Sequence, residues 1–270
     1  MQAPSTLPAI AAKALTRRFD QFVAVDRLDL EVGAGVIFGL LGANGAGKST
    51  TIKMLTTLLP PTSGSAVVAG YDVIHDSAAV RRHIGYVPQL VSADGALTGY
   101  ENLLLSARLY DVPRTERQGR IDEALAFMGL TEAARSLVKT YLGGMVRRLE
   151  LAQAMLHRPA VLFLDEPTSG LDPMARHAIW ERLRESRSRF AMTVLITTHD
   201  MEEAEQLCDV LAIMHAGRIA ASGTVGDLKA SVGPDATLDD VFTHYAGGVT
   251  IEGGRFRDIV SARRTANRLG

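Results

Sequence analysis

The chain has 270 residues, 47% of them hydrophobic, which is enough for the core of one large domain or two small ones. Its formal net charge is −1, so no global positive field attracts nucleic acid or an anionic membrane surface, and we expect no nucleic-acid partner. The single cysteine, Cys208, excludes an internal disulfide and fits a reducing compartment.

Strand patterns dominate the first third of the chain. From Leu7 to Val32, apolar and polar residues alternate imperfectly, which predicts antiparallel strands. The apolar run Val36 to Leu41 predicts a buried strand. Ser65 to Val73 is expected to add one short strand to the antiparallel sheet. Ile84 to Val87 predicts a further strand, which ends at Pro88-Gln89.

A phosphate-binding loop follows the buried strand, because the stretch from Gly42 to Thr50 has a glycine, four variable residues and then Gly-Lys-Ser. Glycines let backbone N–H groups turn inward and approach phosphate oxygens closely. Lys48 would reach the β- and γ-phosphates, and Ser49 would ligate Mg²⁺ at the positive end of a helix. The predicted nucleotide-binding residues of this loop are Gly42, Asn44, Gly45, Ala46, Gly47, Lys48, Ser49 and Thr50.

Helical spacing follows the loop and returns in the middle of the chain. Ile52, Leu55, Leu58 and Leu59 predict a helix that Pro60-Pro61 stops. Residues 97–145 read as a mostly helical insertion. Beyond it, strands are predicted at 161–165, 194–198 and 210–214, with helices at 173–187 and 200–207. This alternation indicates an α/β core wound around a parallel sheet.

The end of the chain has a different character. Residues 248–270 are rich in arginine with little apolar periodicity, and they predict a solvated or loosely ordered tail, the alternative being a lipid or partner contact. No apolar run along the chain approaches the roughly 20 residues that span a bilayer, and its start lacks a secretory signal. We therefore expect a protein that is soluble by itself.

Two carboxylates end the apolar strand at 161–165. Asp165 and Glu166 would lie at the carboxyl edge of the sheet, where α/β proteins bind ligands. Asp165 is suited to hold Mg²⁺ through its water shell, and Glu166 to polarise an attacking water. The alternative is that these acids are simply the polar exit of the strand.

These motifs, in this order, resemble the ATP-binding cassette (ABC) family, the ATPase subunits of ABC transporters. The resemblance spans Leu15 to Ala221 and implies a P-loop NTPase core with a parallel sheet, an N-terminal antiparallel β subdomain and a helical insertion, together the nucleotide-binding domain 1–247. It rests further on Gln89, Tyr141 to Met145, Ser169 to Pro173, and Thr198-His199-Asp200. Gly143-Gly144-Met145, Arg147 to Glu150 and Leu238 to Phe242 look like the drug and antibiotic exporter branch typified by daunorubicin-resistance ATPases.

The resemblance implies roles for further residues. Phe19 matches the aromatic residue on which adenine stacks, although Phe22 lies nearby. Tyr100-Glu101-Asn102 resembles the edge of a groove for a membrane subunit, the alternative being an ordinary helix N-terminus. The remaining roles are metal and water sensing by Gln89, γ-phosphate sensing by His199, coupling of two subunits by Asp172, and binding of the opposing nucleotide by Gly143 and Gly144.

The signature departs from the family at two positions. Leu142 stands where the family has serine, and Val146 stands where this branch usually has arginine. Leucine has no hydroxyl and cannot cap a helix, which costs about 1 kcal/mol of local stability. Loss of one charged hydrogen bond could cost on the order of 1.5 to 3 kcal/mol in closure over the opposing nucleotide.

The implied function is ATP hydrolysis by in-line attack of water on the γ-phosphate. Lys48, Ser49 and Mg²⁺ would neutralise charge, Glu166 would orient or deprotonate the water, and His199 and Gln89 would sense the phosphate. The expected partners are a second ATPase subunit, identical or different, and an integral membrane permease on a separate chain. A drug, antibiotic or lipid-like compound would be exported through that permease, with this chain peripheral to the cytoplasmic face of the membrane.

Three rival functions differ from this one in specific features. A regulatory subunit that hydrolyses ATP poorly would account for Leu142. A cassette of DNA repair or of the ribosome commonly has two cassettes in one chain or a long coiled-coil insertion, and neither pattern occurs in this sequence. A P-loop kinase would leave the signature and His199 unexplained.

Overall fold

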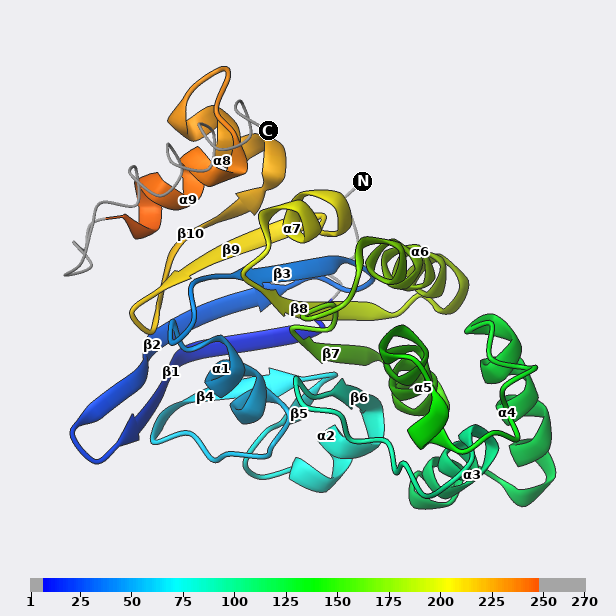
Figure 1. The fold of residues 1–270 in the computed structure, drawn as a ribbon. Coiled ribbons are helices and arrows are strands. Elements are labelled where there is room, and N and C mark those ends of the chain that lie inside the picture. The colour runs from blue at the N-terminus through cyan, green and yellow to red at the C-terminus, as the bar shows by residue number, and fades with distance from the viewer. Residues whose placement is uncertain (1–6, 248–270) are drawn as a thin grey trace, which may run out of the picture.

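A six-stranded sheet forms the centre of the computed structural model, which describes residues 7–247 (Figure 1). The strand order is β10-β9-β3-β8-β7-β6. Neighbouring strands are parallel, apart from β9 and β10, which pair antiparallel. The strands are β3 (Ile37–Leu41), β6 (Ile84–Val87), β7 (Val161–Asp165), β8 (Thr193–Thr198), β9 (Val210–His215) and β10 (Arg218–Thr224).

The central strands are buried on both faces. Every residue of β3, β7 and β8 is buried, which explains why these strands have nearly continuous apolar sequences. In the parallel register Asp165 lies opposite Thr197, and Leu41 lies opposite Thr198. The carboxyl ends of these three strands therefore meet at one edge, as expected from the sequence.

A second, antiparallel sheet has the order β2-β1-β4-β5 and confirms the predicted N-terminal β subdomain. Its strands are β1 (Ile10–Phe19), β2 (Phe22–Val32), β4 (Ser63–Val68) and β5 (Tyr71–Asp72). The prediction of one strand over 65–73 was wrong in detail, because the segment forms a hairpin. Ala69 and Gly70 both have positive φ, at 51° and 85°, and such a pair reverses the chain between two strands.

Helices cover the parallel sheet and extend from one end of it (Figure 1). Between β6 and β7, within and after the predicted helical insertion, lie α3, α4, a short 3₁₀ helix and α5. These are α3 (Gly99–Leu109), α4 (Arg114–Phe127), η1 (Val138–Thr140) and α5 (Gly143–Met155). The others are α1 (Lys48–Leu55), α2 (Ser77–His83), α6 (Pro173–Phe190), α7 (Met201–Leu207), α8 (Val225–Val232) and α9 (Leu238–Ala246).

Helix α1 is shorter than the apolar spacing predicted. It ends at Leu55, with Thr56 as C-cap, because Thr57 takes a left-handed conformation with φ of 64° that ends the helix. Leu58 lies outside the helix, and 59% of its surface is exposed. A residue expected on the buried helix face is therefore on the surface of the protein.

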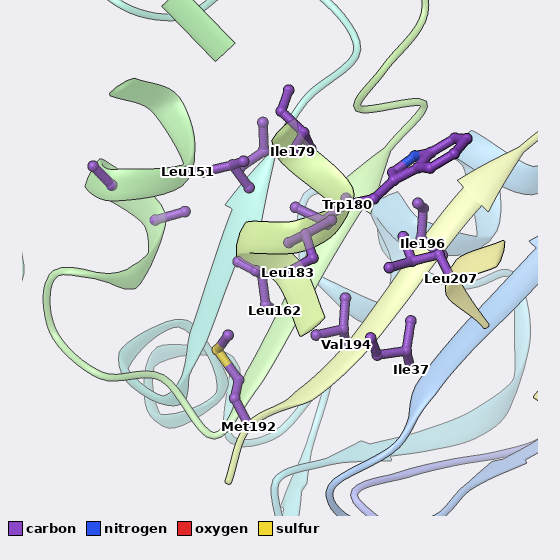
Figure 2. Packing of buried hydrophobic residues seen from close by; sticks show 14 of the residues in the cluster. Ile37, Leu151, Leu162, Ile179, Trp180, Leu183, Met192, Val194, Ile196 and Leu207 are labelled. Atoms are coloured by element: carbon purple, nitrogen blue, oxygen red, sulfur yellow. The ribbon is translucent and has the colours of Figure 1, made fainter. Parts of the chain in front are cut away.

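Two hydrophobic cores hold the six-stranded sheet between them. Successive residues of one strand alternate between the cores: Leu162 and Leu164 of β7 belong to one, and Val161 and Phe163 to the other. Figure 2 shows part of the first core, where Trp180 of α6 belongs to the same cluster as Val194 and Ile196 of β8. This packing on both faces fixes the strand ends that carry the polar side chains.

Within residues 7–247, no helix is long and apolar enough to cross a membrane. The tail at 248–270 lies outside the described residues. The boundaries proposed for the domain and for its helical insertion stay predictions.

Candidate functional site

The loop before α1 has the backbone conformation expected of a phosphate-binding loop. Gly45 and Gly47 have φ of 82° and 107°, which residues with side chains rarely adopt. A Cβ on Gly47 would lie 2.5 Å from the carbonyl oxygen of Ala24. Gly47 is also the N-cap of α1, so no side chain caps the first N–H groups of this helix. Those groups and the helix dipole favour a bound anion.

Lys48 is the first residue of α1 and is only 4% exposed. Its Nζ donates to the carbonyl oxygens of Gly42 at 2.8 Å and Ala43 at 3.1 Å. It also forms an ion pair with Glu166 Oε1 at 3.3 Å. The loop thus folds back over the lysine, and this holds the ammonium group between the loop and the end of β7.

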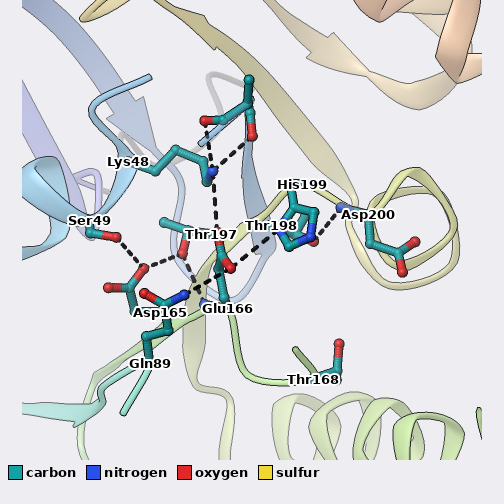
Figure 3. A network of polar contacts seen from close by, with 12 residues as sticks. Lys48, Ser49, Gln89, Asp165, Glu166, Thr168, Thr197, Thr198, His199 and Asp200 are labelled. Carbon is teal, nitrogen blue, oxygen red and sulfur yellow. Dashed lines mark hydrogen bonds and ion pairs between the residues drawn. The ribbon is translucent and has the colours of Figure 1, made fainter. Parts of the chain in front are cut away.

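Asp165 is joined to the loop and to the neighbouring strand (Figure 3). Its Oδ1 accepts from Ser49 Oγ at 3.0 Å and from Thr197 Oγ1 at 2.6 Å. These two hydrogen bonds anchor Asp165 beside the first turn of α1. Burial, and to a lesser extent the charge of Asp165, raise the pKa of Tyr86 to about 12, so this tyrosine stays neutral.

Glu166 lies at the centre of the site (Figure 3). Its Oε2 accepts from Gln89 Nε2 at 3.2 Å and lies 3.3 Å from His199 Nδ1. The backbone N–H of Glu166 donates to the carbonyl and hydroxyl oxygens of Thr197. Its φ of 47° is unusual for a residue with a side chain and costs on the order of 1–3 kcal/mol. A backbone conformation with strain of this size persists only where contacts with neighbouring residues hold it.

A pocket of about 360 Å³ opens between these groups. Its lining is Phe22, Ala24, Asn44, Gly45, Gly47, Lys48, Ser49, Thr50, Gln89 and Glu166. Ala46 is 7% exposed and, like Gly42, is not among the lining residues. Phe22 lines the pocket. Phe19 pairs with Phe22 across the hairpin turn between β1 and β2, and the Arg17 guanidinium lies 4.6 Å from the centre of the Phe19 ring. Both rings are exposed rather than core, and the adenine role of Phe19 stays a prediction.

The oxygens of Ser49 and Asp165 suit a magnesium ion. They lie within hydrogen-bond distance of each other, and hydroxyl and carboxylate oxygens are ligands that Mg²⁺ prefers. Gln89, the third predicted ligand, faces the same pocket and presently donates to Glu166. Mg²⁺ takes few ligands from a protein when phosphate and water supply the rest, so this small donor set fits.

The signature residues do not line this pocket. Gly143 and Gly144 form the first turn of α5, whose N-cap Leu142 makes no side-chain hydrogen bond and is 76% exposed. Asp172 caps α6, where its carboxylate accepts from the N–H of Ala175 at 3.0 Å. The structure thus gives their local geometry, and their roles toward a second subunit stay predictions.

Tyr100 and Glu101 lie in the first turn of α3. Thr98 is the N-cap, and Glu101 accepts hydrogen bonds from its N–H and hydroxyl at 2.8 Å. These bonds hold the pKa of the Glu101 carboxyl below its usual range. The segment is locally a capped helix N-terminus, as the alternative interpretation proposed, while its docking role stays a prediction.

Sequence reasoning missed Thr197, whose hydroxyl group contacts both acids. It donates to Asp165 and accepts from the N–H of Glu166. Its position on β8, two residues before His199, was the available signal. Arg147 was also missed as a site residue, because nothing in its sequence position reveals the backbone carbonyls that it contacts.

Comparisons with known proteins agree with this geometry. A family model described as "ABC transporter" matches residues 25–169, more than half of the chain. The daunorubicin/doxorubicin resistance ATP-binding protein DrrA of Streptomyces peucetius is 46% identical over 225 residues, which are 83% of this chain and 68% of that protein. A solved structure described as the ATP-binding subunit of an ABC transporter has a TM-score of 0.79 at 32% identity, covering 89% of this chain and 99% of the other.

A second solved structure, cbiO1 from Clostridium perfringens, is described as part of the ABC transporter complex cbiONQ. Its TM-score is 0.77 at 26% identity, covering 83% of this chain and 92% of that one. ABC ATPases in general bind ATP, usually with Mg²⁺, and work with membrane permeases. The resemblance inferred from the motifs is confirmed: the chain belongs to the ABC transporter family, as an ATP-binding subunit homologous to drug-resistance ATP-binding proteins.

Proposed function

We propose that this chain hydrolyses ATP and thereby powers the export of a drug, antibiotic or lipid-like compound through a membrane permease on a separate chain. The observation that carries the proposal is the position of Glu166. Its carboxylate adjoins Lys48, Gln89 and His199 at the mouth of the phosphate pocket. The export of a drug-like compound is inferred from the name of the relative DrrA.

In the proposed reaction, the chain's own residues bind the phosphates and prepare the water. The Lys48 ammonium, now shared among two carbonyls and Glu166, would turn to the β- and γ-phosphate oxygens. Glu166 would then accept a hydrogen bond from the attacking water and take its proton as the water attacks. His199 Nδ1 and the Gln89 amide would orient that carboxylate and contact the γ-phosphate.

Magnesium would be held by Ser49 and Asp165, with Gln89 at the edge of its shell. When bound, it would neutralise charge on the phosphate oxygens. Thr197 fixes the Asp165 carboxylate through its 2.6 Å hydrogen bond, so this ligand would be oriented before the ion arrives.

The membrane subunit is proposed to dock in a groove at the C-terminal end of α3, which is not lined by Gln89 or by the Tyr100-Glu101-Asn102 segment that the resemblance indicated. This groove, of about 360 Å³, is lined by Thr56, Leu58, Ala78, Arg81, Arg82, Ile84, Tyr86, Leu109, Tyr110 and Asp111. Leu109 is 72% exposed and Leu58 is 59% exposed, so an apolar surface is available to a partner helix. Docking there would hold the chain at the cytoplasmic face of the membrane.

A second ATPase subunit, identical or different, is proposed to face the phosphate pocket with its signature. Leu142 and Met174, which flank Gly143-Gly144 and Asp172 in sequence, are 76% and 84% exposed. The alternative of a weakly hydrolysing cassette rests on Leu142 alone, and the residues proposed for catalysis do not support it, because they adjoin one another.

Substitution of Glu166 by glutamine tests the proposed function. Glu166→Gln keeps the size and hydrogen bonding of the side chain but removes the proton acceptor, so ATP hydrolysis should fall by about two to four orders of magnitude while ATP binding persists. Steady-state hydrolysis and nucleotide binding by the full chain are the measurements. The exposed Glu132→Gln is the matched control and should retain activity. Unchanged hydrolysis in Glu166→Gln would overturn the assignment.

A further inference from the structure

Arg147, in the second turn of α5, is an almost fully buried arginine that contacts two loops of the site. It is 6% exposed. Its Nε donates to the carbonyl oxygen of Pro167 at 2.7 Å, and its Nη1 donates to that of Pro88 at 2.7 Å. Its Nη2 reaches the carbonyl oxygens of Gln89 at 3.3 Å and Glu166 at 3.4 Å. One guanidinium thus binds the backbone of both Gln89 and Glu166.

The two loops leave adjacent parallel strands. Val87, the last residue of β6, pairs with Leu164 of β7, so residues 88–89 and 166–167 emerge side by side. Arg147 binds the carbonyls of these segments, while the Gln89 and Glu166 side chains meet at 3.2 Å. The planar fork of an arginine can hold several acceptors at fixed angles, and this suits it to set one loop against the other.

Glu150, one turn further along α5, holds the arginine in place. Its Oε2 pairs with Arg147 Nη1 at 3.0 Å, and its Oε1 accepts from Ser92 Oγ at 2.9 Å and from the Ser92 N–H. Glu150 is itself 2% exposed. The ion pair therefore connects α5 with the whole segment 88–92 that carries Gln89.

The conformation of Glu166 shows why its loop needs such support. Its left-handed backbone persists only when neighbouring contacts hold it. Arg147 holds the carbonyls of Glu166 and Pro167. The residue after Pro167, Thr168, donates from its Oγ1 to the buried Glu203 of α7 at 2.6 Å. The loop is therefore fixed at both ends.

From these contacts we propose that Arg147 is a positioning residue for ATP hydrolysis, which sets the Glu166 carboxylate and the Gln89 amide against each other, with Glu150 as its support. The inference rests on the proposed catalytic role of Glu166. The hydrogen bonds of Arg147 reach the phosphate pocket lining only through the backbone of these two residues. It should therefore affect the rate of hydrolysis more than the affinity for ATP.

The first test is Arg147→Lys, assayed in the full chain with MgATP. A lysine keeps the charge beside Glu150, but a single ammonium cannot reach carbonyls on two loops. We expect kcat to fall by about 10- to 100-fold, as for a displacement of a catalytic group by about 1 Å, with KM for ATP changed less than about twofold. Retention of kcat within about twofold of the parent would overturn the proposal.

The neighbouring Arg148 supplies a matched control. It lies on the same helix and also donates to backbone carbonyls, but these belong to Met128 and Gly129 just after α4 and, at 3.4 Å, to Gly144 in the preceding turn of α5 itself, not to the loops after β6 and β7. Arg148→Lys should therefore keep kcat within about twofold. An equal loss in Arg148→Lys and Arg147→Lys would show that any disturbance of α5 lowers activity, and would contradict a specific role for Arg147.

A second variant keeps the test decisive if Arg147→Lys fails to fold. Glu150 offers one oxygen to Ser92 and the other to Arg147, whereas the amide of Glu150→Gln has only one oxygen and turns N–H groups toward one of these partners. We expect a 3- to 10-fold loss of kcat at unchanged KM, with circular dichroism like that of the parent. A folded Glu150→Gln variant with parental kcat would overturn the proposal.

A double-mutant cycle separates positioning from general packing. If Arg147 acts through Glu166, then Arg147→Lys should lower hydrolysis in the parent but have little further effect in the Glu166→Gln background. If the two substitutions instead lowered the rate of hydrolysis by independent factors that multiply in the double variant, the proposal would be contradicted. Failure of the proposed function itself is distinct, because the parent chain would then hydrolyse no ATP or Glu166→Gln would match it.

Discussion

At the scale of single residues, the neighbours Asp165 and Glu166 are separated by their environments. Asp165 ends β7 in regular strand geometry and is bonded to Ser49 and Thr197. Glu166 leaves the strand with positive φ, which turns its carboxylate toward Lys48 and His199. One acid is thus suited to a metal and the other to a water, although both follow the same apolar run. A strand pattern predicts neither the turn of the backbone nor its support by Arg147.

His157 offers a residue-scale prediction of pH dependence. Burial is the main cause that lowers its pKa to about 4, and the charges of Arg120 and His83 lower it further, against a hydrogen bond to the Ile84 carbonyl. In the unfolded chain an ordinary histidine titrates near 6.5, so between these values the unfolded state binds more protons. Stability should therefore fall as the pH decreases from about 6.5 to about 4, by on the order of 2 kcal/mol.

The measurement is the free energy of unfolding against pH for the parent and for His157→Phe. Phenylalanine keeps the ring that stacks on Tyr110, whose centre lies 3.8 Å away, but it cannot titrate. The slope between pH 6.5 and 4 should be smaller in this variant. Tyr110→Phe retains the stack and the histidine and should keep the parental slope. Equal slopes in His157→Phe and the parent would contradict the assignment.

At the scale of elements, apolar runs predicted strands better than they predicted helix ends. The runs at 161–165 and 84–87 match β7 and β6, because parallel strands buried on both faces need continuous apolar sequence. The end of α1 was misplaced, because the positive φ of Thr57 is set by local backbone packing that apolar spacing does not report. Contacts between distant segments, such as Arg147 with Pro88 and Pro167, leave no periodic signal.

The groove at the end of α3 yields an element-scale prediction. Leu109→Glu would place a charge on the apolar surface proposed for docking. Co-purification with the membrane subunit should be lost, while hydrolysis by the isolated chain stays within about twofold. Val67→Glu, on the exposed face of β4 and 36% exposed before substitution, is the control for an added surface charge. Docking at this groove would be refuted if Leu109→Glu lost both co-purification and ATP hydrolysis, or if it co-purified with the membrane subunit normally.

The same structure makes Glu101 a poorer probe of docking than its sequence position indicates. Reversal of its charge would also break the capping box with Thr98, at a cost of about 1 kcal/mol to α3. A transport defect in such a variant would mix helix stability with partner contact. Leu109 avoids this difficulty, because it ends α3, is largely exposed and lines the groove proposed for docking, whereas Glu101 does not line it.

At the scale of the whole molecule, the pocket and the signature belong to different surfaces of one chain. Lys48 and Glu166 line the pocket, and Gly143 and Gly144 do not. Lys48 begins α1 in the loop region after β3, and Glu166 follows β7; both strands are fixed between two cores, while the signature begins α5 on one side of them (Figure 1). A signature that contacts a nucleotide would therefore contact one held by a second subunit. The apolar and exposed Leu142 would then lie in the interface between the two subunits.

Leu142→Ser tests that arrangement. A serine at the N-cap of α5 would restore a helix cap worth about 1 kcal/mol and would offer a hydroxyl group to the opposing γ-phosphate. If roughly 1.4 kcal/mol is recovered in the closed dimer, ATP-dependent dimerisation and hydrolysis should rise by as much as about tenfold. Both are measured at matched protein concentration, by sedimentation with ATP and by steady-state hydrolysis.

Leu142→Ala is the matched control for this last prediction, because it removes the bulk of leucine without adding a hydroxyl group. A gain in Leu142→Ser alone would assign the effect to the hydroxyl, and an equal gain in both variants would assign it to the exposed leucine side chain, which is 76% accessible in the single chain. In a homodimer both nucleotide sites would improve, whereas pairing with a different cassette would improve one. No gain in either assay would mean that backbone N–H groups and the dipole of α5 do all of the phosphate binding and that leucine is functionally neutral here.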